Sequence, residues 1–208
     1  MVLITIDGNI GSGKSTCISK LKSLFPQITV LQEEIKNFNP WLKLYYSDMN
    51  RYAMGFQMEV LLSHLEHGKI ISENSNSSNL ILSERSPLSC IHVFGEFLLK
   101  NNILCAEEQD LCIRYNEKYG WMPDHIIYIQ TKPENCFKRV QKRNRINEND
   151  ITLDYLKNIG QLYDQLYINK NIKSNLILPK ILVINGNQTI EKVVEDIKNI
   201  LSVHVTKK

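Results

Sequence analysis

The stretch from Gly8 to Thr16 constrains what this chain can fold into more than any other part of the sequence. It follows an apolar run, Val2 to Ile6, and has the pattern Gly, four residues, Gly-Lys-Ser. In this pattern backbone N–H groups surround phosphates, the lysine reaches the β- and γ-phosphates, and the serine hydroxyl binds magnesium. Glycines let the backbone approach an anion closely, and the following helix directs its positive end at the same charge. We therefore expect a site for ATP and Mg²⁺ made by Gly8, Asn9, Ile10, Gly11, Ser12, Gly13, Lys14, Ser15 and Thr16.

The size and charge of the chain are typical of an ordinary globular enzyme. With 208 residues, the chain is long enough to bury a sizeable core in a single domain. The formal net charge of +3 is only mildly basic and gives no indication of a nucleic-acid partner. No apolar run approaches the roughly 18 residues that a membrane-spanning helix needs, so we expect no membrane partner.

The cysteines indicate a reducing compartment. They are odd in number, widely spaced and without a Cys-x-x-Cys pair: Cys17, Cys90, Cys105, Cys112 and Cys136. This distribution argues against both a disulfide framework and a zinc site. We expect reduced thiols in a cytoplasmic protein.

Apolar segments alternate with helical patterns along the chain. Strands are expected at residues 2–6, 28–31, 80–83, 126–129 and 181–184, and helices at residues 14–24, 41–46, 51–67, 88–99, 107–118, 153–167 and 190–201. A further helix is expected to begin at Thr131, which forms a capping-box pattern with Glu134 and is followed by Pro133 in the first turn. Strands that alternate with helices predict an α/β fold with a parallel sheet and helices on both faces.

Charged side chains follow two of the predicted strands. Glu33 comes after the second strand, and Glu84 and Arg85 come directly after the third. In open α/β sheets, ligands bind at the carboxyl ends of the strands. A magnesium ion on Ser15 needs further oxygen ligands, and Glu84 is our candidate for one of them.

A basic cluster follows the fourth predicted strand. It places five cations in eight residues, at Lys138, Arg139, Lys142, Arg143 and Arg145. Phosphoryl transfer is catalysed mainly by positioning and charge neutralisation, and an inserted arginine raises the rate by about 10³–10⁵. We expect the three arginines to form a lid at about residues 139–150. The alternative is a solvated helix end whose cations interact with the helix dipole.

Glu33 indicates what accepts the phosphoryl group. A hydroxyl acceptor benefits from a nearby carboxylate that takes its proton, whereas a phosphate acceptor would be repelled by that carboxylate. Glu33 therefore favours a nucleoside over a nucleotide as acceptor, and the neighbouring Glu34 is a rival for the same role.

With these residues assembled, the chain resembles the deoxynucleoside kinase family, which includes deoxycytidine kinase, deoxyguanosine kinase, mitochondrial thymidine kinase and the insect multisubstrate enzyme. The resemblance covers nearly the whole chain. It rests on the phosphate loop, Glu33, the segment from Asn39 to Tyr46, Phe56-Gln57, Glu84-Arg85-Ser86, the lid from Arg139 through Arg143-Asn144-Arg145 to Glu148, and Leu153-Asp154-Tyr155-Leu156.

The resemblance implies a fold, a reaction and a set of site residues. The fold would be a P-loop kinase fold with a five-stranded parallel sheet, an arginine-rich lid and, commonly, a homodimer. Glu33 would be the general base for the 5′-hydroxyl of a deoxynucleoside, with Arg85 beside it. The other implied contacts are Tyr46 and Glu148 at the 3′-hydroxyl, Gln57 at the base edge, Phe56 and Phe94 against the base, and Lys14, Ser15, Glu84, Arg139, Arg143 and Arg145 at the phosphates and magnesium.

Departures from the family pattern bear on the substrate. The family usually has a proline directly after the catalytic glutamate, where this chain has Glu34. Its cellular purine-accepting and deoxycytidine kinases carry an arginine and an aspartate at the positions that align with His64 and Cys90, and neither charge is present here. With Val60, His64 and Cys90 around Gln57, the pocket is similar to that of the thymidine-accepting or broad members. We therefore expect pyrimidine deoxynucleosides, thymidine first, in nucleotide salvage.

Two other classes of function stay open from the sequence. A thymidylate kinase would share the fold, the phosphate loop and the basic lid, but Glu33 argues against a phosphate acceptor. A GTPase or a non-catalytic nucleotide-binding module is a more remote alternative. The segment from Asn169 to Ile172 lacks the aspartate of a guanine-reading Asn-Lys-x-Asp motif.

Overall fold

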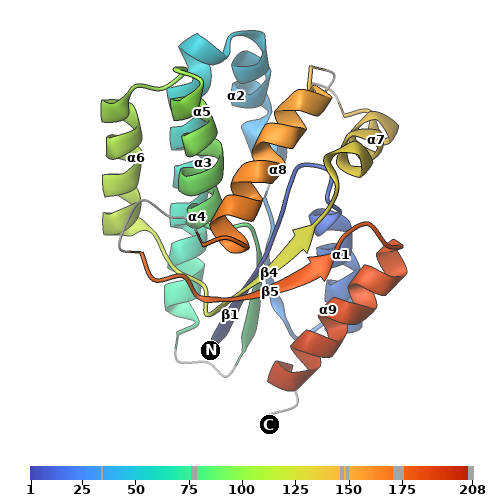
Figure 1. Cartoon of the computed structure of the whole chain (residues 1–208). Coiled ribbons are helices and arrows are strands. Elements are labelled where there is room, and N and C mark those ends of the chain that lie inside the picture. Colours follow the sequence, from blue (N-terminus) through green and yellow to red (C-terminus); the bar gives the residue numbers. More distant parts are fainter. Residues whose placement is uncertain (34, 76–78, 146–147, 149, 171–175, 206–208) are drawn as a thin grey trace.

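A twisted sheet of parallel strands forms the centre of the molecule (Figure 1). The computed structural model describes residues 1–33, 35–75, 79–145, 148, 150–170 and 176–205. In this part of the chain, five strands are ordered β2-β3-β1-β4-β5: β1 (Val2–Asp7), β2 (Thr29–Leu31), β3 (Leu80–Glu84), β4 (His125–Gln130) and β5 (Lys180–Asn185). Every pairing between neighbouring strands is parallel. The predicted α/β fold with a parallel sheet is confirmed.

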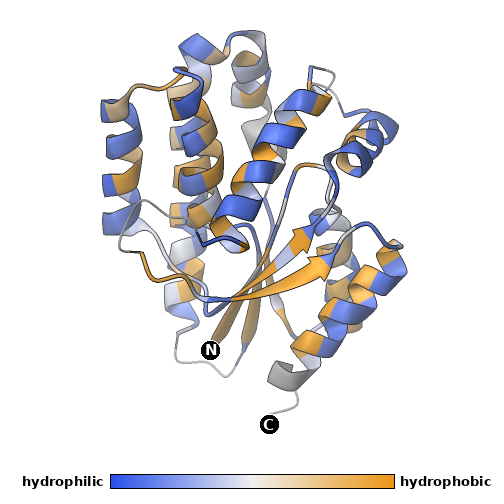
Figure 2. Ribbon diagram, in the orientation of Figure 1, coloured by the Kyte–Doolittle hydropathy of each residue, from blue (hydrophilic) through white to orange (hydrophobic). Residues whose placement is uncertain are grey.

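The alternation of side chains along each strand divides the core into two halves. In β4, Ile127 and Ile129 pack into one hydrophobic cluster, whereas Ile126 and Tyr128 pack into another. Successive strand residues point to opposite faces, so a continuous apolar run buries both faces at once. Figure 2 shows this run as the predominantly apolar colouring of the strands.

Helices cover both faces of the sheet (Figure 1). The face of Ile127 is covered by α1 (Lys14–Leu24) and α9 (Ile190–Val205), whose apolar residues belong to the same cluster. The remaining helices pack on the other face or over the end of the sheet: α2 (Ile35–Ser47), α3 (Met49–Glu73), α4 (Pro87–Ser89), the π-helix η1 (Cys90–Gly95), α5 (Glu96–Lys100), α6 (Ala106–Tyr119), α7 (Pro133–Arg143) and α8 (Leu153–Tyr167).

Several helices differ in extent from the prediction. The helix predicted at 51–67 begins at Met49 and ends at Glu73, with the Asp48 side chain accepting a hydrogen bond from the Arg51 N–H. The helix predicted at 88–99 is a continuous run of α4, η1 and α5, in which the central turn is π-helical. Pro40 lies inside α2, where the sequence predicted a helix beginning at the next residue.

The capping box predicted at Thr131 and Glu134 is wrong. The N-cap of α7 is Lys132, and Pro133 is the first residue of the helix. The side chain of Asn187, more than 50 residues later, accepts hydrogen bonds from the Lys132 N–H and the Asn135 amide. A distant acceptor therefore fixes this helix start, which a local pattern does not reveal.

All five cysteines are free thiols, and Cys105 is the exposed one. Among the helices described, none is long and apolar enough to cross a membrane.

Candidate active site

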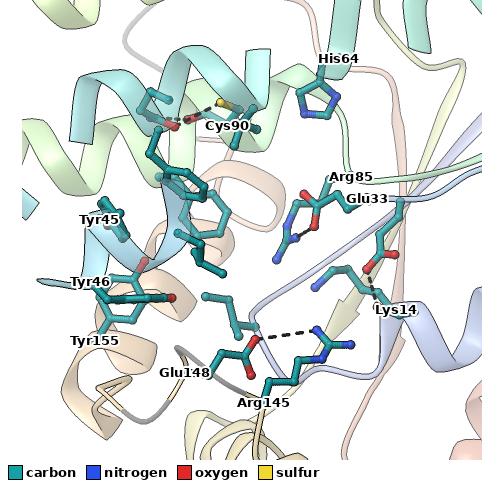
Figure 3. A pocket seen from close by; sticks show the side chains of 18 of the residues that line it. Lys14, Glu33, Tyr45, Tyr46, His64, Arg85, Cys90, Arg145, Glu148 and Tyr155 are labelled. Carbon is teal, nitrogen blue, oxygen red and sulfur yellow. Dashed lines mark hydrogen bonds and ion pairs between the residues drawn. The ribbon is translucent and has the colours of Figure 1, made fainter. Parts of the chain in front are cut away.

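A deep cavity lies at the carboxyl end of the sheet, between the phosphate loop and the helices α2, α3, η1 and α8 (Figure 3). Its empty volume, including the open mouth, is about 960 Å³. The cavity brings together most of the residues predicted from the sequence: Ile10, Lys14, Ser15, Glu33, Tyr46, Phe56, Gln57, Val60, His64, Glu84, Arg85, Cys90, Phe94, Arg143, Arg145 and Glu148.

The phosphate loop forms one end of this cavity, and its conformation depends on glycine. Gly8, Gly11 and Gly13 all have positive φ angles. A Cβ on Gly11 would lie 2.5 Å from the carbonyl oxygen of Cys136 in α7. Gly13 is the N-cap of α1 and brings no side-chain acceptor, so the first N–H groups of the helix are available to an anion.

Lys14 is folded back onto its own loop. Its ammonium donates to the carbonyl oxygens of Gly8 at 2.8 Å and Asn9 at 2.9 Å, and the side chain is buried. Burial lowers the pKa of Lys14 to about 8, with the neighbouring Arg85 charge acting in the same direction. Phosphate oxygens in the loop would stabilise the charged form.

Ser15 and Glu84 meet beside the loop. The Ser15 hydroxyl donates to Glu84 Oε1 at 2.7 Å, although 69 residues separate the two in sequence. A hydroxyl and a carboxylate offer the hard oxygen ligands that Mg²⁺ prefers, with phosphates and water completing its shell. Within the described residues, no cluster of three or more His, Cys, Asp or Glu side chains offers a metal site made by protein alone.

Glu33 and Arg85 form an ion pair in the wall of the same cavity. Because β2 and β3 are neighbours, the residues that follow them meet at the same edge of the sheet. Arg85 Nη1 donates to Glu33 Oε2, and the Arg85 guanidinium lies 5.3 Å from the centre of the Phe94 ring. Burial raises the pKa of the Glu33 carboxyl, and the Arg85 charge opposes this shift. A carboxylate with a raised pKa is a stronger base for a hydroxyl proton.

The backbone of Arg85 is strained, with a φ of 60°. Its carbonyl accepts a hydrogen bond from the Ser83 hydroxyl, and its N–H continues the ladder to β1 by donating to the Ile6 carbonyl. A positive φ is uncommon for residues other than glycine and clusters at functional sites. This turn directs the Arg85 side chain into the cavity instead of along the strand.

The lid arginines fall into two groups. Arg143 makes a bidentate pair with the buried Glu148, with both hydrogen bonds at 2.7 Å, and Arg145 Nη1 lies 3.8 Å from Glu148 Oε1 (Figure 3). Arg139 does not line the cavity. Its guanidinium donates to the carbonyl oxygens of Ser12 at 3.1 Å and Gly186 at 2.9 Å, so it supports the phosphate loop from behind. The catalytic role of Arg139 stays a prediction.

The far end of the cavity contains the residues that we expect to read the base. Gln57 Nε2 donates to the Cys90 carbonyl oxygen at 3.3 Å, and the Cys90 thiol donates to Gln57 Oε1 at 3.4 Å. His64 is buried against the cavity (Figure 3), and among the described residues neither of its ring nitrogens has a hydrogen-bond partner. Burial lowers the pKa of His64 to about 3, so the ring is neutral near pH 7.

Four cavity residues were not predicted from the sequence: Leu42, Tyr45, Leu98 and Tyr155. Tyr45 could have been predicted from its position next to Tyr46 in the sequence. In the structure the two rings are in contact, with their centroids 5.2 Å apart. Tyr155 lies inside a motif already noted, whereas an isolated leucine gives no such signal. Other predicted residues lie outside the cavity lining and form the loop itself: Gly8, Asn9, Gly11, Ser12, Gly13 and Thr16.

Two sequence arguments fall on residues that the structure does not describe. Glu34, the rival for the base role, lies outside the described residues, as do Asn171 and Ile172 of the segment compared with a guanine-binding motif. The choice between Glu33 and Glu34 as general base therefore stays a prediction.

Known proteins resemble this chain over nearly its whole length. Residues 4–206 match the family model described as deoxynucleoside kinase. The chain is 31% identical over 202 residues to putative kinase protein 143R of Invertebrate iridescent virus 6, covering 97% of each chain. It is 29% identical over 206 residues to the human protein named thymidine kinase 2, mitochondrial, covering 93% of this chain and 74% of that protein. A solved structure of deoxyadenosine kinase from M. mycoides has a TM-score of 0.82 at 21% identity, covers 97% of this chain and 100% of that one, and shares the fold.

Proposed function

This chain belongs to the deoxynucleoside kinase family, and from that premise we propose that it transfers the γ-phosphate of ATP to the 5′-hydroxyl of a pyrimidine deoxynucleoside. The observation that carries the proposal is the largely buried ion pair between Glu33 and Arg85, which lines the same cavity as Lys14. We propose thymidine as the first substrate and nucleotide salvage as the role.

The reaction uses the two ends of the cavity together. Glu33 takes the proton of the 5′-hydroxyl, the hydroxyl oxygen forms a bond to the γ-phosphorus, and the bond from that phosphorus to the bridging oxygen of ADP breaks. Lys14 and the N–H groups at the start of α1 bind the phosphates, while Arg143 and Arg145 neutralise the charge that develops on the transferred group. Arg85 orients Glu33 and its hydroxyl partner.

Magnesium fits the oxygen pair of Ser15 and Glu84. These two side chains would hold the ion beside the ATP phosphates, where it supplies charge neutralisation when bound. Their 2.7 Å hydrogen bond places both oxygens on the same side of the loop.

The side chains of the base pocket support recognition of the base by uncharged groups. Gln57 is held by Cys90, and the neutral His64 has a ring donor and a ring acceptor without a partner among the described residues. Such groups can pair with the amide-like edge of thymine without a charged partner. The names of similar proteins refer to different bases, thymidine and deoxyadenosine, so the choice of base depends on these side chains.

The sugar site is assigned to Tyr46 and Glu148. Both line the cavity, Tyr46 from α2 and Glu148 from the lid, and about a hundred residues separate them in sequence (Figure 3). A hydrogen bond from the 3′-hydroxyl to Glu148 would tie the acceptor to the lid, because Arg143 holds the same carboxylate.

The domain organisation, the oligomeric state and the compartment that we propose are those expected from the family resemblance. We propose one kinase domain over residues 1–208, with the lid at about 139–150, that works as a homodimer in the cytoplasm. Helices α3 and α6 support a dimer, because they pack on each other and leave Leu62, Ile70, Leu111 and Tyr119 between 37% and 47% exposed. Sedimentation should show a dimer that Leu111→Glu converts to a monomer.

The competing function is a nucleoside monophosphate kinase. Its acceptor phosphate would have to lie against the Glu33 carboxylate, which repels it in a buried site. Arg85 is the feature that would favour such an acceptor, but its Nη1 is already paired with Glu33.

A steady-state phosphorylation panel tests the proposal. Thymidine, deoxycytidine, deoxyadenosine, deoxyguanosine and dTMP are compared with ATP and Mg²⁺, ranked by kcat/KM. Turnover of nucleosides with thymidine first is the expected result. Turnover of dTMP alone would refute the base role of Glu33, and guanine-nucleotide binding without any acceptor-dependent turnover would refute the kinase assignment.

A further inference from the structure

Asp7 is a buried acid that the proposed reaction does not use. It ends β1, directly before the phosphate loop, and is 0% exposed. Its Oδ1 accepts hydrogen bonds from the Gly8 N–H at 2.8 Å and the Tyr163 hydroxyl at 2.9 Å, and its Oδ2 accepts one from the Tyr167 hydroxyl at 2.7 Å. None of these donors is a cation. All three partners donate to Asp7, so a carboxylate suits this position, whereas an amide would turn its own N–H₂ donor toward at least one of them.

Tyr163 connects this carboxylate to the reaction site. Its hydroxyl oxygen donates to Asp7 and accepts a hydrogen bond from Arg85 Nε at 3.3 Å. Its ring meets the Phe94 ring edge to face, with centroids 6.3 Å apart, and Phe94 in turn packs against the Arg85 guanidinium. Tyr163 is fully buried and is not among the described residues that line the cavity, so it lies behind Arg85 instead of beside the substrate.

We propose that Tyr163, held by Asp7, is a positioning residue that fixes the Arg85 guanidinium and, through it, the Glu33 carboxylate. The negative charge of Asp7 polarises the Tyr163 O–H bond, which makes the tyrosine oxygen a stronger acceptor for Arg85 Nε. When a nucleoside hydroxyl approaches Glu33, the Arg85 guanidinium stays hydrogen-bonded to Tyr163 and therefore does not move with the Glu33 carboxylate. The expected effect on kcat rests on the proposed function, whereas the expected effect on the position of the Arg85 guanidinium does not.

Tyr167 provides a matched control. It lies on the same helix, α8, one turn after Tyr163, is equally buried, and donates to the same carboxylate. Of the two hydroxyls, the hydrogen bonds described tie that of Tyr163 alone to Arg85. Tyr163→Phe and Tyr167→Phe each remove one hydroxyl bonded to Asp7, so their losses in Tm should be similar.

The kinetic experiment compares the two variants with each nucleoside that the wild type accepts. Tyr163→Phe should lower kcat about tenfold or more, with the KM for ATP unchanged, because a hydrogen bond to a charged, orienting group is lost. The acidic limb of its kcat/KM profile should move to higher pH, since a less fixed Arg85 stabilises the Glu33 carboxylate less. Tyr167→Phe should stay within about twofold of the wild type. Equal losses of kcat in both variants would overturn the proposal.

A double-mutant cycle tests whether Tyr163 acts through Arg85. Lysine at position 85 keeps a positive charge for Glu33 but has no Nε–H to direct at Tyr163. In the Arg85→Lys background, Tyr163→Phe should therefore change kcat less than about twofold. A full, additive tenfold loss would show that Tyr163 acts by another route and would overturn the proposal.

A measurement without substrate separates this inference from the proposed function. The Glu33 carboxyl is titrated by ¹³C NMR in the wild type and in both tyrosine variants, with Glu33→Gln identifying the resonance. The Glu33 pKa should rise by about one pH unit in Tyr163→Phe alone. An unchanged value would refute the positioning role even if nucleosides are phosphorylated, whereas a raised value without nucleoside turnover would refute the proposed function and leave the positioning role intact.

Discussion

The two ends of the cavity are built in different ways. The donor end is made by one continuous segment, in which backbone groups and three glycines with positive φ angles form the surface for phosphate. The acceptor end is made by side chains from several separate segments: the residues that follow β2 and β3, and the helices α2, α3, η1 and α8. Every nucleoside triphosphate presents the same phosphates, so a backbone site is sufficient for the donor. A particular acceptor requires particular side chains, and only these can vary without changing the fold.

The ends also differ in their unsatisfied groups. At the donor end, Lys14 is hydrogen-bonded to the loop that it serves. At the acceptor end, the ring nitrogens of the buried His64 have no partner among the described residues. An unpaired buried polar group costs free energy that a matching ligand can recover, which is a source of selectivity. The comparison predicts that substitutions at the donor end change ATP binding, whereas those at the acceptor end change turnover and substrate choice.

Glu33→Gln should have the largest effect. Loss of the proposed general base should lower turnover by about 10²–10⁴, while the KM for ATP should change little, because Glu33 is hydrogen-bonded to Arg85 and not to the loop. Steady-state kinetics with the best nucleoside measure both constants. Glu34→Gln is the matched variant, and a larger loss there than at Glu33 would move the base role to Glu34. A large rise in the KM for ATP would contradict the idea that the donor end and the acceptor end act independently.

Arg143→Ala should cost somewhat less, about 10²–10³ in kcat, as for the loss of one charge-stabilising donor. Because Arg143 also holds Glu148, this variant should in addition raise the KM for the nucleoside. It is therefore the residue at which the two ends are coupled. Lys142→Ala, at an exposed neighbour, is the control. An effect confined to KM would contradict a role of Arg143 in the transfer step.

The same contrast explains what the sequence predicts. The phosphate loop is a local pattern, and Glu33, Glu84 and Arg85 each follow a predicted strand, so the topology of a parallel sheet brings them together. The link from Asp7 to Tyr163 joins residues 156 positions apart. In the sequence, Tyr163 belongs to the apolar face of a helix, and nothing distinguishes it from a core residue.

Local sequence patterns also do not reveal in which direction a side chain points from its helix. The basic cluster predicts a lid, but it does not reveal that the Arg139 guanidinium is bonded to the Ser12 and Gly186 carbonyls while Arg143 lines the cavity. Similarly, Gln57 and Cys90 are both expected near the base, yet their mutual hydrogen bonds depend on how α3 packs on η1. Packing between elements decides these contacts.

Gly11→Ala should act at the donor end alone. The new Cβ would lie 2.5 Å from the Cys136 carbonyl oxygen, at a φ of 80° that alanine rarely adopts. Strain of this kind costs about 1–3 kcal/mol, so the Kd for ATP should rise by roughly 10–100-fold as the loop distorts. Calorimetry should at the same time show an unchanged Kd for the nucleoside. A loss of nucleoside affinity of the same size would show that the two ends are not independent.

The ATP affinity should also depend on pH through Lys14. Burial lowers the pKa of Lys14 to about 8, so the ammonium loses its proton as the pH rises through that value. Phosphates bind the charged form better, and the Kd for ATP should increase about fivefold between pH 8 and 9. Lys14→Arg, which stays charged, should show a flat profile over this range. A flat profile in the wild type would mean that Lys14 keeps its charge despite its burial.

Tyr46→Phe should have the smallest effect and the most specific one. A neutral hydrogen bond contributes about 0.5–1.5 kcal/mol, so kcat/KM for thymidine should fall by roughly 2–12-fold. A 3′-deoxy analogue cannot make this contact, so its kcat/KM should not change. The preference for thymidine over the analogue should therefore become smaller. Tyr45→Phe, at the adjacent ring of the cavity wall, should keep the wild-type preference. Equal losses for both substrates would mean that Tyr46 shapes the wall without binding the sugar, and Glu148 would then be the remaining candidate for that contact.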